Sequence, residues 1–412
     1  MALRTLLCIG AAAAALAATQ ANAATIVLVD QGGVAGSKAE QGFNIAAAYW
    51  GATLNNNITI TLGVSYAALP TGVIGSTGSS AMDYSVSAWE SGVNATKSSS
   101  ATDANLVLPT LTNGAAAFIT NGPNVGSMGV NTATSALRYD TDTSGLNAIN
   151  NKTLYLNTAN VKAVGGTATY AADNTQHLDG EVQFSSTFGF DFNPTDGVTA
   201  GTFDFIGVAI HEIGHALGFV SGVDYLDYFG APNGDGATAG NAYNFNQTSI
   251  YSALDMFRYS TDPNNVAPGT GPVLDLAAGT PSYFSVDGGK TALNGNLFAT
   301  GSYNGDGDQA SHWKDASGAN ACGPQLGIMD PTFCYGQRGE VTALDLAAFD
   351  AIGYNLASDA LSSNYLVNTA QIYNRFAASA VPEPMTWSLM IAGMGLVGGT
   401  MRRRSTRVSF AF

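Results

Sequence analysis

Two histidines and a glutamate stand within one short stretch, His211-Glu212-Ile213-Gly214-His215. On a helix, positions i and i+4 share a face, so the two imidazoles can reach one metal ion. The residue after the first histidine projects beside that face, where a carboxylate can take a proton from water on the metal. The flanking residues are apolar, which predicts a buried helix, and a buried imidazole pair needs a partner. Two satisfied surface histidines are the alternative, but the pattern favours a zinc site with Glu212 as general base.

A third protein ligand is needed, because catalytic zinc usually takes three and leaves one position for water. The chain has two other histidines, His177 and His312, and a carboxylate shortly after the pair, Asp224. His177 lies in a polar stretch that is typical of a surface turn. Asp224 is either a ligand or an ordinary acidic residue near the end of the helix. The residues alone leave His312 and Asp224 open.

The extended pattern His211-Glu212-x-x-His215-x-x-Gly218 resembles the metzincin clan of zinc proteases. In most metzincins the third ligand lies three residues after that glycine, but here the position is Ser221, a poor zinc ligand. Leishmanolysin-like metzincins instead have a long insertion before a distant third histidine. Ser311-His312-Trp313, followed by Ile328-Met329-Asp330-Pro331, resembles that order. The resemblance implies His312 as the third ligand and Met329 as an apolar floor beneath the metal.

The same resemblance implies a fold and a reaction. The fold class would be α+β, metzincin-like, with a mixed sheet, a backing helix, an active-site helix and long loops rich in Gly, Asn and Asp. The activity would be that of a zinc metalloendopeptidase, which hydrolyses a protein or peptide substrate by a zinc-activated water with Glu212 as general base. Some metzincins have a tyrosine two residues after the methionine of the turn; here that position is Pro331, so that role is unfilled.

Two other functions stay open. One is a non-catalytic envelope or matrix protein with a structural zinc site, and the other is a zinc hydrolase of another amide bond. The presence of Glu212 argues against the first, because a structural site needs no general base.

Local patterns predict the elements that hold these residues. Helical spacing of apolar residues predicts a helix over 40–50, and alternation predicts strands over 58–66 and 181–188. The metzincin resemblance implies that the strand 181–188 lines the cleft and pairs with the substrate backbone. The apolar segment 204–219 predicts the helix of the histidine pair, with Thr202 or Asp204 as its N-cap and Gly218 near its end.

The rest of the chain is poorer in periodic patterns. A Thr342-x-x-Asp345 capping box predicts a helix over 342–352. The segment 71–135 is expected to form loops with short strands, and 229–310 a long loop with one helix-like stretch at 248–258.

Both ends have the patterns of targeting segments. Residues 1–23 combine a positive start, an apolar run and Ala21-Asn22-Ala23, which predicts a cleaved signal peptide. The uncharged run 385–401 precedes Arg402, Arg403 and Arg404, which predicts a transmembrane helix with that end in the cytoplasm.

With Pro382-Glu383-Pro384 in front of the apolar run, the segment 381–404 resembles the PEP-CTERM sorting segment of Gram-negative bacteria. That resemblance implies an exported protein, held at the inner membrane until a sorting protease removes the tail, and then placed at the cell surface or released outside. An ordinary tail anchor is the alternative. A single metalloprotease catalytic domain is expected between the ends, over 24–378, with an N-terminal subdomain to about 219 and a C-terminal subdomain after it.

Cysteine content and charge agree with export. Cys8 leaves with the signal peptide, and Cys322 and Cys334 are then more consistent with a disulfide than with a metal pair. The disulfide would either stiffen the floor around Met329 or pin a surface loop. The 412 residues contain 30 acids and 15 bases, a net charge of −15, which argues against a nucleic-acid partner.

Two loops alternate Asp and Asn with Gly, over Asn233–Gly236 and Asn304–Asp308. Such residues can supply oxygen ligands to Ca²⁺, which makes Ca²⁺ a candidate second cofactor. Solvated turns are the alternative, because neither loop has the closing glutamate of an EF-hand.

Overall fold

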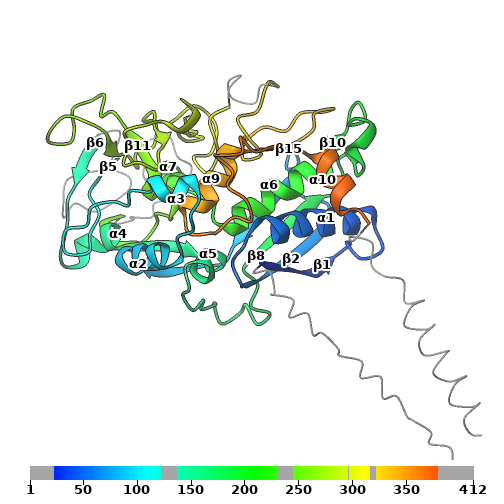
Figure 1. The fold of residues 1–412 in the computed structure, drawn as a ribbon, viewed down its shortest axis with the longest axis horizontal. Coiled ribbons are helices and arrows are strands. Elements are labelled where there is room, and N and C mark those ends of the chain that lie inside the picture. The colour runs from blue at the N-terminus through cyan, green and yellow to red at the C-terminus, as the bar shows by residue number, and fades with distance from the viewer. Residues whose placement is uncertain (1–22, 122–136, 230–244, 296, 316–321, 379–412) are drawn as a thin grey trace, which may run out of the picture.

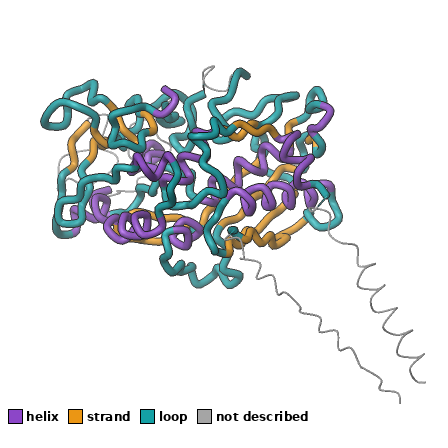
Figure 2. The backbone as a smooth tube through the Cα atoms, viewed as in Figure 1, coloured by secondary structure: helices purple, strands orange, loops and turns teal. Residues whose placement is uncertain are grey.

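A computed structural model describes residues 23–121, 137–229, 245–295, 297–315 and 322–378 (Figure 1). Residues 1–22 of the predicted signal peptide, the sorting segment 381–404 and the loop Asn233–Gly236 lie outside these residues. The described part is mixed α+β, with several small sheets joined by long loops, as Figure 2 shows. The α+β class expected from the sequence is therefore confirmed at this level. Within the described ranges, no helix has the length and apolarity that a membrane span requires.

A four-stranded sheet has the order β1-β2-β8-β3, with β1 at Thr25–Gly32, β2 at Thr59–Ala67, β8 at Gly180–Ser185 and β3 at Gly75–Ser79. The first three strands run parallel and β3 runs antiparallel along the edge. The strands expected over 58–66 and 181–188 are thus confirmed. The expectation that 181–188 pairs with a substrate is wrong, because β8 is bonded on both sides and β3 occupies the edge position instead.

Two helices, α1 (Lys38–Thr53) and α6 (Phe205–Leu217), lie side by side on one face of this sheet (Figure 1). They match the helices expected over 40–50 and 204–219. The Trp50 indole donates a hydrogen bond to the Ile210 carbonyl at 3.0 Å. Gly42 lets the Phe205 ring approach α1, since a Cβ at Gly42 would lie 2.2 Å from that ring. The backing helix therefore fixes both the depth and the rotation of α6.

The segment expected to be loops over 71–135 also contains a helix, α2 (Val86–Thr96), which the sequence analysis missed. Its buried residues Val86, Trp89 and Val93 do have helical spacing, but Ser, Gly, Asn and Thr between them mask the pattern. The helix-like stretch expected at 248–258 is a short 3₁₀ helix, Leu254–Phe257, followed by strand β11, Arg258–Ser260. The prediction of helical structure there is confirmed only for these four residues.

One continuous apolar core runs from Ala24 to Ile372. Residues on both sides of position 219 share it: the rings of Trp89 and Phe257, both in the core, lie 5.9 Å apart. A backbone bridge between Ile119 and Asp275 also joins the two sides. The subdomain boundary near 219 stays a prediction.

The C-terminal part contributes α9 (Ala343–Ala351), whose N-terminus has the expected capping box of Thr342 and Asp345. The shorter elements are α3 (Ala101–Asn105), α4 (Ile149–Lys152), α5 (Thr158–Ala163), α7 (Val223–Phe229), α10 (Thr369–Phe376), β4 (Ala81–Ser85), β5 (Phe118–Asn121), β6 (Leu137–Asp140), β7 (Thr153–Asn157), β9 (Phe190–Asp191), β10 (Phe203–Asp204), β12 (Val273–Leu274), β13 (Tyr283–Phe284), β14 (Glu340–Thr342) and β15 (Leu366–Asn368).

Candidate metal centre

Both ends of α6 are fixed by residues that the sequence predicts. Asp204 is the N-cap and accepts hydrogen bonds from the backbone N–H groups of Ile206 and Gly207. Gly218 ends the helix in the left-handed region at φ 118°, where a side chain would be strained. The Asn157 amide donates to the carbonyls of His215 and Ala216, so the last turn is also bonded from outside the helix.

Three histidines meet at one point. The Nε2 atoms of His211 and His215 lie 3.0 Å apart, those of His215 and His312 lie 3.1 Å apart, and those of His211 and His312 lie 3.3 Å apart. His312 comes from a loop about a hundred residues further along the chain. In the described part of the chain, these residues are the group of three that could hold a metal ion. The structure thus brings His312, and not Asp224, to the helical pair.

The other ring nitrogen of each histidine lies at a backbone carbonyl. His211 Nδ1 is 2.7 Å from the Ile328 carbonyl oxygen, His215 Nδ1 is 2.7 Å from that of Phe219, and His312 Nδ1 is 3.2 Å from that of Gln309. A carbonyl only accepts, so each Nδ1 carries the proton and each Nε2 presents a lone pair.

Three lone pairs that face one another repel unless a cation lies between them. The ligands of a tetrahedral zinc ion, at Zn–N distances of about 2.0–2.1 Å, are themselves about 3.3 Å apart. The observed separations of 3.0–3.3 Å are close to that value. The donor set therefore fits a divalent cation bound by imidazoles.

Burial keeps these imidazoles neutral. It lowers the pKa of His211 to about 3, with a further contribution from His215, and lowers the pKa of His215 to about 4. Burial also holds the pKa of His312 well below its ordinary value. Neutral imidazole is the form that binds a metal.

Asp224, the alternative third ligand, has a different task. Its carboxylate accepts hydrogen bonds from the backbone N–H groups of Ala310 and Ser311 and from the Ser311 hydroxyl. Ser311 also accepts a bond from the Ser221 backbone N–H at 2.8 Å. Asp224 therefore fixes the segment directly before His312 to the start of α7, and acts as a positioning residue.

Met329 lies against the turn of α6 that carries His211 and His215, the place that the sequence analysis expected for a floor residue. It is fully buried, and a Cβ at Gly214 would lie 2.6 Å from its Sδ atom. The glycine between Glu212 and His215 is thus the place where the methionine approaches the helix.

We expect Gly214→Ala to lower the free energy of unfolding by about 1 kcal/mol, because overpacking of the new methyl group against the buried Met329 exceeds the gain in helix propensity. Chemical denaturation measures the change. The same substitution in a Met329→Ala background should cost clearly less, because the atom that it collides with is gone. Equal costs in the two backgrounds would show that Met329 does not limit this position.

Asp345 joins the floor to the third histidine. It accepts hydrogen bonds from Trp313 Nε1 at 2.8 Å, from the Ile328 backbone N–H at 2.9 Å and from the Met329 backbone N–H at 3.2 Å. The sequence identified Asp345 only as the capping-box residue of α9. No local pattern could show that its remaining acceptor positions serve a loop and a turn far away in the chain.

The expected disulfide is present between Cys322 and Cys334. Met329 lies between the two cysteines in the sequence, so the disulfide closes a covalent loop that includes Met329.

Glu212 lies beside the histidines and is nearly buried. Thr77, on the edge strand β3, donates a hydrogen bond from its hydroxyl to Glu212 Oε2 at 2.7 Å. A Cβ at Gly75 on the same strand would lie 3.1 Å from the other oxygen, Oε1. Burial raises the pKa of Glu212 to about 7, and the bond from Thr77 opposes that rise. Sequence reasoning missed Thr77, because it lies in a stretch that was expected to be loop.

Two other sites from the sequence analysis do not join this cluster. His177 is exposed in a turn with φ 53° and stacks on Tyr170, with ring centroids 4.9 Å apart. In the loop Asn304–Asp308, Asn304 binds Asp227, and Asp306 pairs with Lys314 at 2.8 Å. These contacts order the loop within the protein, and its predicted role in Ca²⁺ binding stays a prediction.

Comparison of the chain with family models, with curated proteins and with solved structures finds no match.

Proposed function

We propose that the protein is a zinc-dependent endopeptidase of the metzincin type, with a leishmanolysin-like arrangement. The observation that carries the proposal is the convergence of three neutral imidazole nitrogens within 4.8 Å, with the Glu212 carboxylate on the same helical turn. The antiparallel edge strand beside that carboxylate and the methionine beneath the helix support the same arrangement.

His211, His215 and His312 would hold the zinc ion. Zinc bound there would supply a Lewis acid that polarises a carbonyl group and makes water more acidic. Glu212 then accepts a proton from the attacking water as the water oxygen bonds to the carbonyl carbon. The carboxyl passes this proton to the amide nitrogen as the C–N bond breaks, which yields a carboxylate and an amine.

The edge strand β3 is suited to orient a peptide. Its partner on one side is β8, and within the described residues its other side has no strand partner. An extended peptide can add to such an edge through backbone hydrogen bonds. Because Thr77 of this strand binds Glu212, a peptide on β3 would lie next to the general base.

Thr77→Val should lower kcat for casein hydrolysis by about tenfold, because the hydrogen bond that orients Glu212 is lost while the shape of the side chain is kept. Zinc content should not change. Thr77→Ser keeps the hydroxyl and should retain most of the activity. A Thr77→Val variant as active as the wild type would show that this contact has no role in the reaction.

The reaction class is tested with a library of peptides and mass spectrometry. We expect new termini at peptide bonds with the zinc-loaded protein, none after removal of zinc by a chelator, and their return when zinc is added back. Cleavage of cell-wall amides without cleavage of any peptide would favour the other zinc hydrolase. Bound zinc without hydrolysis of either substrate would favour a structural zinc site.

The targeting patterns belong to the same proposal: the protein is exported and sorted through its tail. Fractionation of the producing bacterium should find a processed form, without the N-terminal segment, at the envelope or in the medium. Substitution of Arg402, Arg403 and Arg404 by alanine should reduce the amount of the protein that is held at the inner membrane through its tail. An unprocessed protein in the cytoplasm would contradict this part of the proposal.

A further inference from the structure

A polar cavity lies on the side of the sheet that faces away from the metal centre. Its volume is about 640 Å³, and its walls include the sheet face and the segment Thr169–Gln176. A Cβ at Gly180 would point at Ala216 of α6, so the next residue of the strand, Glu181, faces the opposite side. The sheet therefore lies between the cavity and the histidine cluster, and Ser79 on the edge strand borders both, since its hydroxyl donates to the His215 carbonyl at 3.3 Å.

Two glycines shape the sheet face at this cavity in different ways. A Cβ at Gly63 would lie within 3.3 Å of Gln31, Leu178 and Glu181, so these three side chains lie over the bare strand. A Cβ at Gly78, on the neighbouring edge strand, would have no atom within 4 Å. A side chain at Gly78 would therefore project into the open space.

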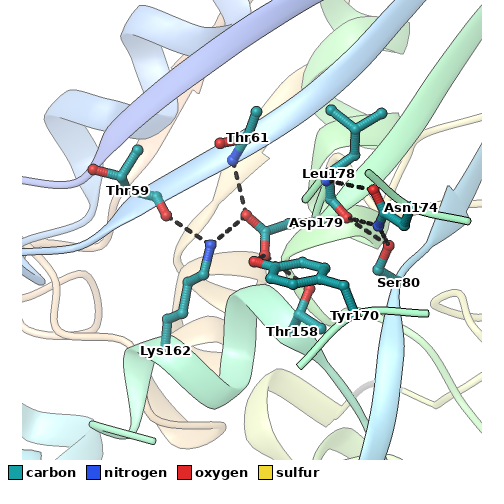
Figure 3. Close-up of polar contacts among 9 residues, drawn as sticks. All are labelled: Thr59, Thr61, Ser80, Thr158, Lys162, Tyr170, Asn174, Leu178 and Asp179. Atoms are coloured by element: carbon teal, nitrogen blue, oxygen red, sulfur yellow. Dashed lines mark hydrogen bonds and ion pairs between the residues drawn. The ribbon is translucent and has the colours of Figure 1, made fainter. Parts of the chain in front are cut away.

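The loop that forms the wall is held in place by a buried carboxylate, Asp179 (Figure 3). Asp179 accepts bonds from Lys162 at 2.6 Å, from the Thr61 backbone N–H at 2.8 Å and from the Tyr170 hydroxyl at 2.9 Å. Asn174 closes the loop further, with bonds from its side chain to Ser80 and to both backbone groups of Leu178. The cavity is thus preorganised, which reduces the entropy lost when a ligand binds.

Hydrogen-bonding groups dominate the lining. Gln31 donates to Gln176 at 2.8 Å, which aligns two amides at the cavity wall. The carboxylates of Asp173 and Glu181 are exposed, and the Tyr155 side chain is 48% exposed. Among the described residues that line the cavity there is no lysine, arginine or histidine.

We propose that this cavity binds a neutral oligosaccharide. A sugar ring has hydroxyls around its edge, which suit amides and carboxylates, and C–H groups on its face, which suit the Tyr155 ring. Two carboxylates without a cation disfavour an acidic glycan or a phosphate. Apart from the rings of Tyr155 and Tyr170, a peptide that binds through apolar side chains finds only Ala81, Ala171 and Leu178 as apolar lining. The volume is in the range of sites for small ligands. The proposal does not depend on the metal centre.

Isothermal titration of the full-length protein with hexamers of glucose and of N-acetylglucosamine tests the proposal, with oligogalacturonate as the acidic probe and a casein digest as the peptide probe. We expect saturable binding of at least one neutral hexamer and none of oligogalacturonate. Tyr155→Ala and Gln176→Ala should each weaken binding about tenfold, because a stacking or a hydrogen-bonding partner is lost. Gly78→Val should remove binding by filling the space.

Tyr335→Ala is the matched control, because this tyrosine is 57% exposed and lies outside the cavity. It should bind the hexamer as the wild type does. Titration of the chelator-treated protein should give the same affinity, which separates this site from the proposed zinc site. The proposal is overturned if neither hexamer binds, if the cavity variants bind like the control, or if only the casein digest binds in a manner sensitive to Gly78→Val.

Discussion

Glu212→Gln should lower the rate of casein hydrolysis by about a thousandfold, within the range that a general acid–base group contributes. Glutamine keeps the size of the side chain and can keep a hydrogen bond with Thr77, but it cannot accept a proton from water. Because Glu212 is not one of the three clustered nitrogen donors, the variant should retain its zinc. The loss should therefore appear in kcat, measured on protein of equal metal content.

Glu340→Gln is the control for this substitution, because Glu340 is an exposed glutamate on β14. It should hydrolyse casein at the rate of the wild type. Circular dichroism should show the same fold for both variants. A Glu212→Gln protein that binds zinc and hydrolyses casein at the wild-type rate would exclude Glu212 as the base.

His312→Ala should lower the affinity for zinc by more than about a hundredfold. Loss of a residue that only hydrogen-bonds to a metal ligand costs up to about a hundredfold, and loss of a ligand itself should cost more. The variant leaves His211 and His215 on the helix, so it tests the contribution of the distant loop alone. Competition with a chromophoric chelator measures the affinity.

His177→Ala is the matched control, since His177 is exposed in its turn and stacks on Tyr170. Its zinc affinity should equal that of the wild type. Asp224→Asn should have a smaller effect than His312→Ala, about tenfold, because Asp224 acts only through its hydrogen bonds to Ala310 and Ser311. If Asp224→Asn lowers the zinc affinity more than His312→Ala does, Asp224 and not His312 would be the third zinc ligand.

Three aspartates hold distant segments of the chain together at the site. Asp204 caps α6 and also accepts bonds from the Gly339 backbone N–H and the Thr369 hydroxyl. Asp224 holds the segment before His312, and Asp345 holds the segment after it together with the floor. In each case a carboxylate bonds backbone N–H groups that would otherwise be buried without partners. The described loop segments next to the histidines are held in this way by carboxylates at the helices α6, α7 and α9.

The sequence was sufficient for the parts of the site that rest on local geometry. The spacing of His211 and His215, the N-cap Asp204 and the C-terminal Gly218 all follow from the repeat of one helix, and the structure has that helix with both caps. That His312 lies near His211 and His215 was predicted from a resemblance to a family. In the structure His312 Nε2 lies 3.1 Å from His215 Nε2.

The remaining contacts depend on tertiary structure that no local pattern encodes. Thr77 reaches Glu212 only because β3 pairs antiparallel with β8, and the stretch before and after it is rich in Gly and Ser. Because β3 covers β8 in this way, the edge strand of the sheet is Gly75–Ser79 and not the expected strand 181–188. Helix α2 was missed for a related reason, because its three buried residues are separated by poor helix formers.

We propose that His211, His215 and His312 hold a zinc ion. X-ray absorption spectroscopy at the zinc edge tests this on the purified protein loaded with one equivalent of zinc. We expect three imidazole nitrogens and one oxygen, all at about 2.0–2.1 Å, with one imidazole fewer in His312→Ala. A protein that binds no zinc, or a spectrum with sulfur ligands or with fewer than three imidazoles in the wild type, would contradict it.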